Sequence, residues 1–279
     1  MHSFNRRFVL RTKSPDFERS MVIKMKRKGL KTILFYLSLV LIWQLVFWLG
    51  TGVFKWWKPY AFPNPLGVWQ SFGLMISQKT LLAAILFSLR RALAGYLLSV
   101  LFGIIVGLLL SRFTAVKAML KPLILGIQSL PSVCWVPFAI LWFGLTEKSI
   151  IFVIVIGSAF SVAIAVEAAI RNVPPLYIRA ARTMGAKGHV LYLRVILPAS
   201  LPALITGFKQ GWSFAWRALM AAEVMSATVG LGQALMMGRD LADINRVMLV
   251  IILIILIGVL IERYVFSLAE ERVLKKIGL

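Results

Sequence analysis

Few side chains in this sequence could carry out chemistry of their own. The only histidines are His2 and His189, and the single cysteine, Cys134, lies inside an apolar stretch. These numbers exclude an intramolecular disulfide and a CxxC metal site, and they argue against a histidine-based metal centre. No GxxxxGK[ST] phosphate loop occurs, so the chain cannot hold ATP phosphates in that manner. We therefore expect no catalytic, cofactor-binding or metal-binding residues.

Two charged residues within apolar stretches remain as candidates for contact with a solute. Glu223 is the only acidic residue that we find inside an apolar run, and Arg217 precedes it. Charges inside a membrane span are costly and often mark a substrate path. Glu223 could contact a cargo molecule, but a structural pair with Arg90 or Arg91 is the interpretation that we favour. Arg217 could attract an anion, or it could be a packed or snorkelling arginine.

The composition places these residues in a membrane protein. The 279 residues are 60% hydrophobic and only 15% charged, with a mean hydropathy of +0.86. In a soluble domain, roughly a quarter of the residues are charged. The net charge of +22 could suggest nucleic acid, but the basic residues cluster between long apolar runs, as the positive-inside rule requires. We therefore expect a lipid bilayer around the chain and no nucleic-acid partner.

A basic segment, residues 176–202, separates two of the apolar stretches. Leu176, Ala180 and Met184 recur at every fourth position, so they share one helical face, and the arginines lie on another. Gly185 precedes a turn at which a helix often ends with a positive φ. The residues alone would also fit a solvated loop.

The spacing within this segment is more specific than its charge. Two alanines are followed after three residues by a glycine, and after nine more by an aliphatic residue, one residue and Leu-Pro. The residues in question are Ala180, Ala181, Gly185, Val195, Leu197 and Pro198. This pattern resembles the "EAA" loop of bacterial ABC importer permeases. The resemblance implies that the loop forms a coupling helix that docks in a groove of a separate ATPase subunit.

One residue of the loop departs from the family pattern. The leading glutamate of the family falls at Arg179, which we interpret as an altered charge at the ATPase contact. The literal sequence Glu167-Ala168-Ala169 has the wrong distance to any Gly and Leu-Pro, so we exclude it. The ATPase-coupling residues that the resemblance implies are Arg179, Ala180, Ala181, Gly185, Leu197 and Pro198.

Further patterns narrow the resemblance to the nitrate, sulfonate and taurine branch of these permeases. They are Phe62–Pro65, Ser88–Arg91, Leu130-Pro131, Val136-Pro137, Leu141–Gly144, Ala221–Glu223 and Gly230–Gly232. The implied fold is the all-α type I ABC importer transmembrane domain, with a second copy of the chain across the translocation path. The implied cargo is a small solute, such as an aliphatic sulfonate, taurine or a similar anion. ATP and Mg²⁺ would bind the separate ATPase, and an extracytoplasmic solute-binding protein would deliver the cargo at a bacterial cell membrane.

The apolar stretches predict six transmembrane helices around this loop. We expect them at residues 33–49, 93–110, 123–145, 150–166, 199–222 and 247–261. Pro131 and Pro137 should interrupt the third span. Residues 51–77 should form an interfacial loop and residues 111–121 an inner loop. Residues 79–92 should form an interfacial or packed extension of the second span.

The basic residues set the predicted topology. Inner segments hold 22 lysines and arginines and outer segments six, so both termini should be cytoplasmic. The predicted divisions are a basic cytoplasmic segment (1–31), a first transmembrane helix (32–50), a transmembrane core (79–268) with its coupling loop (171–198), and a cytoplasmic tail (269–279).

Two rival classes fit the sequence less well than an importer permease. A secondary active transporter often holds paired acids within the membrane and shows two similar halves. This chain offers Glu223 alone and no convincing internal repeat. A membrane enzyme would need a cluster of catalytic side chains, which is absent. We therefore predict a transport subunit that is not itself an enzyme.

Overall fold

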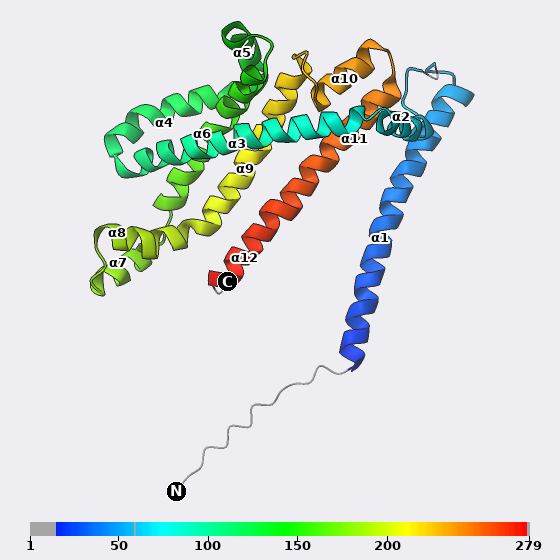
Figure 1. Cartoon of the computed structure of the whole chain (residues 1–279). Helices are drawn as coiled ribbons and strands as arrows, with labels where there is room; N and C mark the ends of the chain where they lie inside the picture. The colour runs from blue at the N-terminus through cyan, green and yellow to red at the C-terminus, as the bar shows by residue number, and fades with distance from the viewer. Residues whose placement is uncertain (1–14, 59, 278–279) are drawn as a thin grey trace. The chain divides into compact units, whose positions relative to one another are not determined.

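The computed structural model of the chain describes residues 15–58 and 60–277, and every regular element within them is helical (Figure 1). This agrees with the predicted all-α class. The chain forms two compact units, residues 1–66 and 67–279. In chain order the elements are α1 (Pro15–Trp48), η1 (Leu49–Val53), α2 (Pro65–Ser77), α3 (Thr80–Arg112), α4 (Thr114–Ser129), η2 (Ser132–Trp135), α5 (Val136–Phe143), α6 (Glu147–Arg171), α7 (Pro175–Thr183), α8 (Gly188–Leu191), η3 (Tyr192–Ile196), α9 (Leu197–Val224), α10 (Leu231–Asp240), α11 (Ile244–Ile261), η4 (Glu262–Ser267) and α12 (Leu268–Ile277).

The first unit consists of the long helix α1 and an aromatic turn that folds back on its end. The indole Nε1 of Trp43 donates to the carbonyl of Pro63 at 2.9 Å, and the Trp57 ring stacks on Phe62 with centroids 4.9 Å apart. Of the predicted basic segment 1–31, residues 15–31 are helical and continue into the span, while residues 1–14 lie outside the described part of the chain.

The number of apolar helices agrees with the predicted six spans. In the part of the chain that the structure describes, five helices are long and apolar enough to cross a membrane: residues 31–53, 80–112, 147–171, 188–224 and 244–275. A sixth span would be the pair Thr114–Ser129 and Ser132–Phe143, which is bent by 95° at a short break. The break falls at Leu130-Pro131, because a proline cannot donate to the preceding turn and disfavours a helical residue before it.

Several predicted boundaries are wrong. Residues 111–121 are not a loop, because α4 begins at Thr114 after the single residue Phe113. The predicted extension of the second span agrees with the structure, because α3 runs unbroken from Thr80 to Arg112. Part of the predicted interfacial loop 51–77 is the helix α2, whose start is supported by the Leu66 amide donating to the Asn64 side chain. Pro137 does not interrupt a helix, because it lies in the first turn of α5, where a missing N–H is tolerated.

The core of the second unit is the packing of α6 against α3 and α9. Glycines on α3 meet branched side chains of α6, and such small residues allow membrane helices to approach closely. A Cβ on Gly103 would lie 2.6 Å from Val162 Cβ and 2.8 Å from the Ala159 carbonyl oxygen. Polar links add to this packing, since Ser158 Oγ donates to the Gly211 carbonyl at 2.8 Å. Helices α3 and α6 can therefore approach closely only because the glycine positions of α3 lack side chains.

The chain connections place different features at the two ends of this core. Figure 1 shows α7 and α8 at one end of α6 and α9, and α5 and α10 at the opposite end. The bent pair α4–α5 runs beside α6, with α4 packed on α3 and α6. The bend between α4 and α5 and the loop of α7 and α8 can thus be linked through α6.

The close contact between α3 and α6 can be tested at Gly103. Gly103→Ala should lower the melting temperature of the purified protein, because overpacking against a backbone carbonyl typically costs about 1–3 kcal/mol. Gly126→Ala on α4 is the matched control, since its Cβ would meet nothing within 4 Å. That control should be neutral or slightly stabilising, by about 0.5–1 kcal/mol. Equal melting temperatures for the two variants would contradict the packing.

Candidate functional site

The basic segment forms a compact loop of two short helices that connects the end of α6 to the start of α9. Helix α7 begins with Pro175 in its first turn, where proline is favoured. After a turn, α8 and the π-helical turn η3 lead without a break into α9. Pro198 lies in the first turn of α9, and the residue before α9 is already helical.

The turn between α7 and α8 needs its glycines. Gly185 has φ +84° and Gly188 has φ +54°, a region that costs L-residues with a Cβ about 1 kcal/mol or more. The Gly185 amide donates to the Arg182 carbonyl at 3.0 Å, and the Ala186 amide to the Ala181 carbonyl at 2.9 Å. The positive φ that the sequence predicted at Gly185 is thus confirmed.

The two alanines of the loop face different surroundings. Ala181 is only 3% exposed and packs with Val173, Leu191 and Ile196 in an apolar cluster of the chain's own residues. Ala180 is exposed, as are Arg179 and, on the same face as Ala180, Leu176 and Met184. Ala181 therefore holds the loop to the body of the chain, whereas Ala180 lies on the exposed face of α7. Leu197 is exposed and Pro198 is half-buried.

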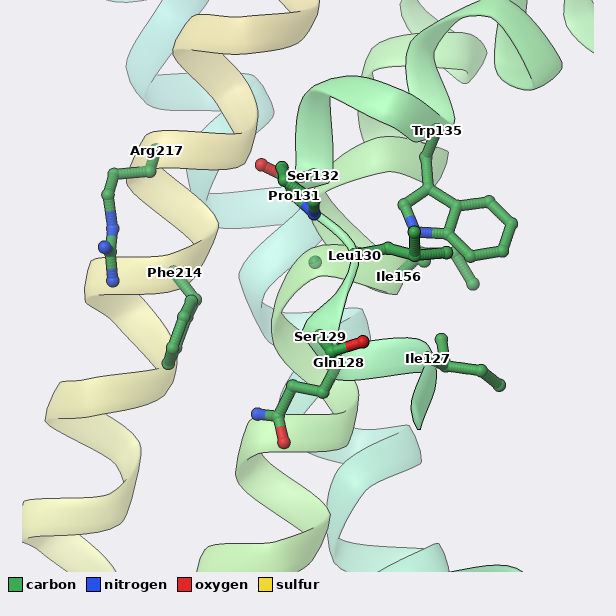
Figure 2. A pocket seen from close by; sticks show the side chains of 11 residues that line it. Ile127, Gln128, Ser129, Leu130, Pro131, Ser132, Trp135, Ile156, Phe214 and Arg217 are labelled. Atoms are coloured by element: carbon green, nitrogen blue, oxygen red, sulfur yellow. The ribbon is translucent and has the colours of Figure 1, made fainter. Parts of the chain in front are cut away.

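A pocket of about 260 Å³ opens at the break between α4 and α5 (Figure 2). Its lining residues are Ile127, Gln128, Ser129, Leu130, Pro131, Ser132, Trp135, Ile156, Gly157, Phe214 and Arg217. Figure 2 shows Arg217 and Phe214 on α9 at one side and the chain from Gln128 to Ser132 at the other. The bend at Pro131 therefore leaves room for a small solute and supplies polar side chains to one wall.

Arg217 is the only charged residue of this pocket. Its Nε donates to the Ser213 carbonyl of its own helix at 3.1 Å, and its guanidinium lies 4.6 Å from the centre of the Phe214 ring. Among the side chains of residues 31–58 and 60–275, no acidic group lies at ion-pair distance from it. An exposed guanidinium with donors to spare can bind a planar or tetrahedral oxyanion through two parallel hydrogen bonds.

Glu223 lies outside this pocket, further along α9 than Arg217, in a buried network beside the start of α10. Its carboxylate is fully buried and pairs with the guanidinium of Arg91 at 2.9 Å. Arg91 also pairs with Glu147 at 3.1 Å, and Glu147 in turn pairs with Arg90. The structure thus joins Glu223 to Arg91, one of the two partners that the sequence suggested, and not to Arg217.

The same carboxylate holds the start of α10. Glu223 accepts hydrogen bonds from Ser88 Oγ at 2.7 Å and from the Gly232 amide at 3.0 Å, and Ser88 Oγ accepts from the Leu231 amide at 2.8 Å. The first amides of a helix have no partner within the helix, so a carboxylate there is favourable. Glu223 therefore ties α9 to α3 and α10, which is the arrangement of a structural residue.

A second buried carboxylate was missed by the sequence reasoning. Glu167 on α6 is fully buried and pairs with Lys117 at 2.7 Å and Lys121 at 2.8 Å, both on α4. Arg171, one turn later on α6, lies 3.5 Å away. The spacing of Lys117 and Lys121 by four residues was a possible signal, but nothing in the sequence indicated which acid they face.

No metal centre is formed by the described residues. Among the described side chains, those of residues 31–58 and 60–275, no group of three or more His, Cys, Asp or Glu could hold an ion. Cys134 is exposed and unpaired in η2. What this part of the chain offers is thus a solute pocket, buried ion pairs and an exposed loop.

Residues 99–274 match the family described as binding-protein-dependent transport system inner membrane component. A protein of Methanocaldococcus jannaschii, an ABC transporter permease by name, is 36% identical over 63% of this chain and 66% of its own length. SsuC of Bacillus subtilis, by name an aliphatic sulfonates transport permease, is 31% identical over 90% of this chain and 89% of its own. TauC of Escherichia coli, by name a taurine transport system permease, is 33% identical over 63% and 64%.

A solved structure shows the same fold at low sequence identity. An amino acid ABC transporter crystallised with histidines contains a chain that superimposes with a TM-score of 0.61 at 16% identity. The superposition covers 72% of this chain and 97% of the other.

The structural role of Glu223 can be tested by two substitutions. Glu223→Gln keeps an acceptor for the Gly232 amide, whereas Glu223→Ala leaves that amide and part of the buried Arg91 guanidinium without a partner. Breaking a buried ion pair from one side typically costs about 3–5 kcal/mol, so the alanine variant should show the lower abundance and melting temperature.

Apparent cargo affinity, measured by transport, is the second readout. It should be unchanged in whatever fraction of either variant is folded. A shift in affinity in both variants at normal protein level would instead assign Glu223 to cargo contact.

Proposed function

The chain belongs to the binding-protein-dependent transport system inner membrane component family, and from this membership we propose how it moves its cargo. It is a permease of the nitrate, sulfonate and taurine branch of type I ABC importers, a multi-pass inner membrane protein that is not itself an enzyme. ATP hydrolysis belongs to a separate ATPase, and the family implies a substrate-binding protein as a further partner. The proposed cargo is an aliphatic sulfonate, taurine or a similar small anion.

The observation that carries the cargo proposal is Arg217 in the pocket at the bend. It is a cation within an apolar helix that is exposed to a pocket, and it has no acidic partner among the described side chains. Such a charge is costly in a membrane unless it faces a polar path. Gln128 and Ser132 add polar side chains beside it. A sulfonate or nitrate group offers the oxygens that this set of donors would bind.

The proposed contact with the ATPase is the loop of α7 and α8. Its exposed face combines apolar side chains with Arg179, which suits a partner groove of mixed character. The buried Ala181 would keep α7 rigid against the body of the chain, so that a push on the loop would reach α6 and α9. Leu197 and Pro198 would belong to the base of this loop, where α9 begins.

We propose that two copies of the chain face each other across the path, as the family resemblance implies. Arg217 and the polar wall of the pocket are open on one side within a single chain. A second copy would close that side and would place two arginines on one path.

The alternative, a secondary active transporter, is less well supported. An ion-coupled carrier needs a carboxylate that can exchange its counter-ion during transport. Among the described residues, the carboxylates of Glu147, Glu167 and Glu223 are each already paired with lysine or arginine. Co-purification with an ATPase in detergent tests the proposal directly, and stable isolation of the chain without any ATPase from its native membrane would contradict it.

The loop contact can be tested at Gly185. Gly185→Leu should leave the helices inserted and abolish cargo-dependent ATP hydrolysis by the complex, because leucine disfavours φ +84° by about 1 kcal/mol or more and adds bulk at the contact. Gly185→Asn is the matched control, since asparagine is similar in size and tolerates this conformation.

Retained hydrolysis in Gly185→Asn would assign the defect to the backbone, and loss in both variants would assign it to bulk. Arg179→Glu, which restores the family residue, should be mild, because an exposed charge contact is worth under about 1 kcal/mol. Normal coupling in Gly185→Leu would show that the loop is not the ATPase contact.

The cargo contact can be tested at Arg217. Arg217→Gln should raise the apparent KM for anion uptake by about tenfold or more, since a hydrogen bond to a charged group is worth about 1.5–3 kcal/mol. Arg217→Lys should have an intermediate effect, because the charge remains but the two-pronged geometry is lost. Lys209→Gln, on α9 but outside the pocket, is the control and should transport normally. An unchanged KM in Arg217→Gln would exclude the contact.

A further inference from the structure

Helix α4 is attached to the rest of the core by few contacts. Of its residues, Thr114 to Ser129, only Ile124 is buried. A helix with one buried residue gains little from apolar packing, and Pro122 removes one of its backbone hydrogen bonds. Its position on α6 must therefore depend on other interactions.

The strongest of those interactions is the pairing of Lys117 and Lys121 with Glu167. Both ammonium groups lie within 2.8 Å of the carboxylate, and both lysines are about three-quarters buried, with 26% and 24% of the side chain exposed. A fully buried carboxylate is costly without partners, so separating α4 from α6 would expose that cost. Two lysines one helical turn apart also fix the rotation of α4, which one lysine could not do.

The two ends of α4 serve different features. Lys117 and Lys121 lie near its start, while Ile127, Gln128 and Ser129 at its end line the solute pocket. Lys117 and Gln128 are separated by roughly 16 Å along a helix with 1.5 Å rise per residue. A displacement of the start of α4 is therefore transmitted to the pocket wall.

Glu167 is also close to the loop on its own helix. Ile170, one turn later, packs against two apolar clusters. One cluster lies in the core around Val162 and Leu204, and the other in the loop around Ala181. Movement of the loop thus reaches the part of α6 that carries Glu167.

We propose that Glu167, with Lys117 and Lys121, is the positioning link that transmits movement of the ATPase-coupling loop to the solute pocket. This inference rests on the proposed function, because it assumes that the ATPase docks on the loop. Glu167 touches neither ATP nor cargo, and it acts by making α4 follow α6. The sequence Glu167-Ala168-Ala169, which the family motif does not use, acquires a role in this way.

The native cysteine provides a reporter for the test. Cys134 is exposed in η2, between the pocket-lining residues Ser132 and Trp135. The experiment uses the complete complex with its ATPase in nanodiscs and measures the rate at which N-ethylmaleimide modifies Cys134. The rate is compared between the nucleotide-free complex and the complex trapped with ATP and vanadate. In the unaltered complex it should differ by roughly threefold or more, as a shift between two populated states requires.

Glu167→Gln should abolish this nucleotide dependence while the ATPase remains bound and hydrolyses ATP. The double variant Lys117→Gln/Lys121→Gln removes the same ion pairs from the side of α4 and should also abolish the nucleotide dependence. It serves as the test if Glu167→Gln is poorly produced. Glu147→Gln is the matched control, because it makes the same change on the same helix but in the pairs with α3. It should keep the full nucleotide dependence.

Two results would overturn the link. One is a full nucleotide response in both Glu167→Gln and the double lysine variant. The other is the absence of any nucleotide response in the unaltered complex, which would mean that movement of the loop does not reach the bent pair α4–α5. ATPase binding and hydrolysis in the unaltered complex are measured in the same samples. A failed link with normal ATPase binding is thereby distinguished from a failed proposed function.

Discussion

The close approach of α6 to α3 and α9 is the constraint on which the rest of the second unit depends. Gly103 and Gly107 on α3 and Gly211 on α9 leave no room for a Cβ against Val162 and its neighbours on α6. In a bilayer, where apolar side chains gain little by leaving lipid, such close packing and a few interhelical hydrogen bonds must hold the helices together. Both ends of α6 then become fixed points from which a loop and a pocket can be positioned.

Charged ties at the two ends of α6 complete this frame. At one end Glu147 and Glu223 share the buried Arg91, and at the other Glu167 receives two lysines from α4. The cationic partners of each carboxylate compensate for the hydration that it loses on burial. The ion pairs therefore fix the positions of the helices more than they add to net stability. The span that lines the pocket is thereby attached to the helix that carries the loop of α7 and α8.

Much of this arrangement could be predicted from local patterns. The helical class, the number of apolar spans, the break at Pro131 and the positive φ of Gly185 each depend on the nature of a few neighbouring residues. Pairings between distant residues could not be predicted. Glu167 and Lys117 are fifty positions apart, and only the packing of α4 on α6 brings them together. The burial of Ala181 could not be predicted for the same reason, since it depends on contacts with Val173, Leu191 and Ile196.

The central claim is that this chain is the path of an importer driven by a separate ATPase. Its most direct test is uptake of radiolabelled taurine, a simple aliphatic sulfonate and nitrate into proteoliposomes. These would contain the chain, its ATPase and its binding protein. We predict accumulation of at least one of these anions that requires ATP, the ATPase and the binding protein together. Accumulation without the ATPase, driven by a proton or sodium gradient alone, would contradict the account.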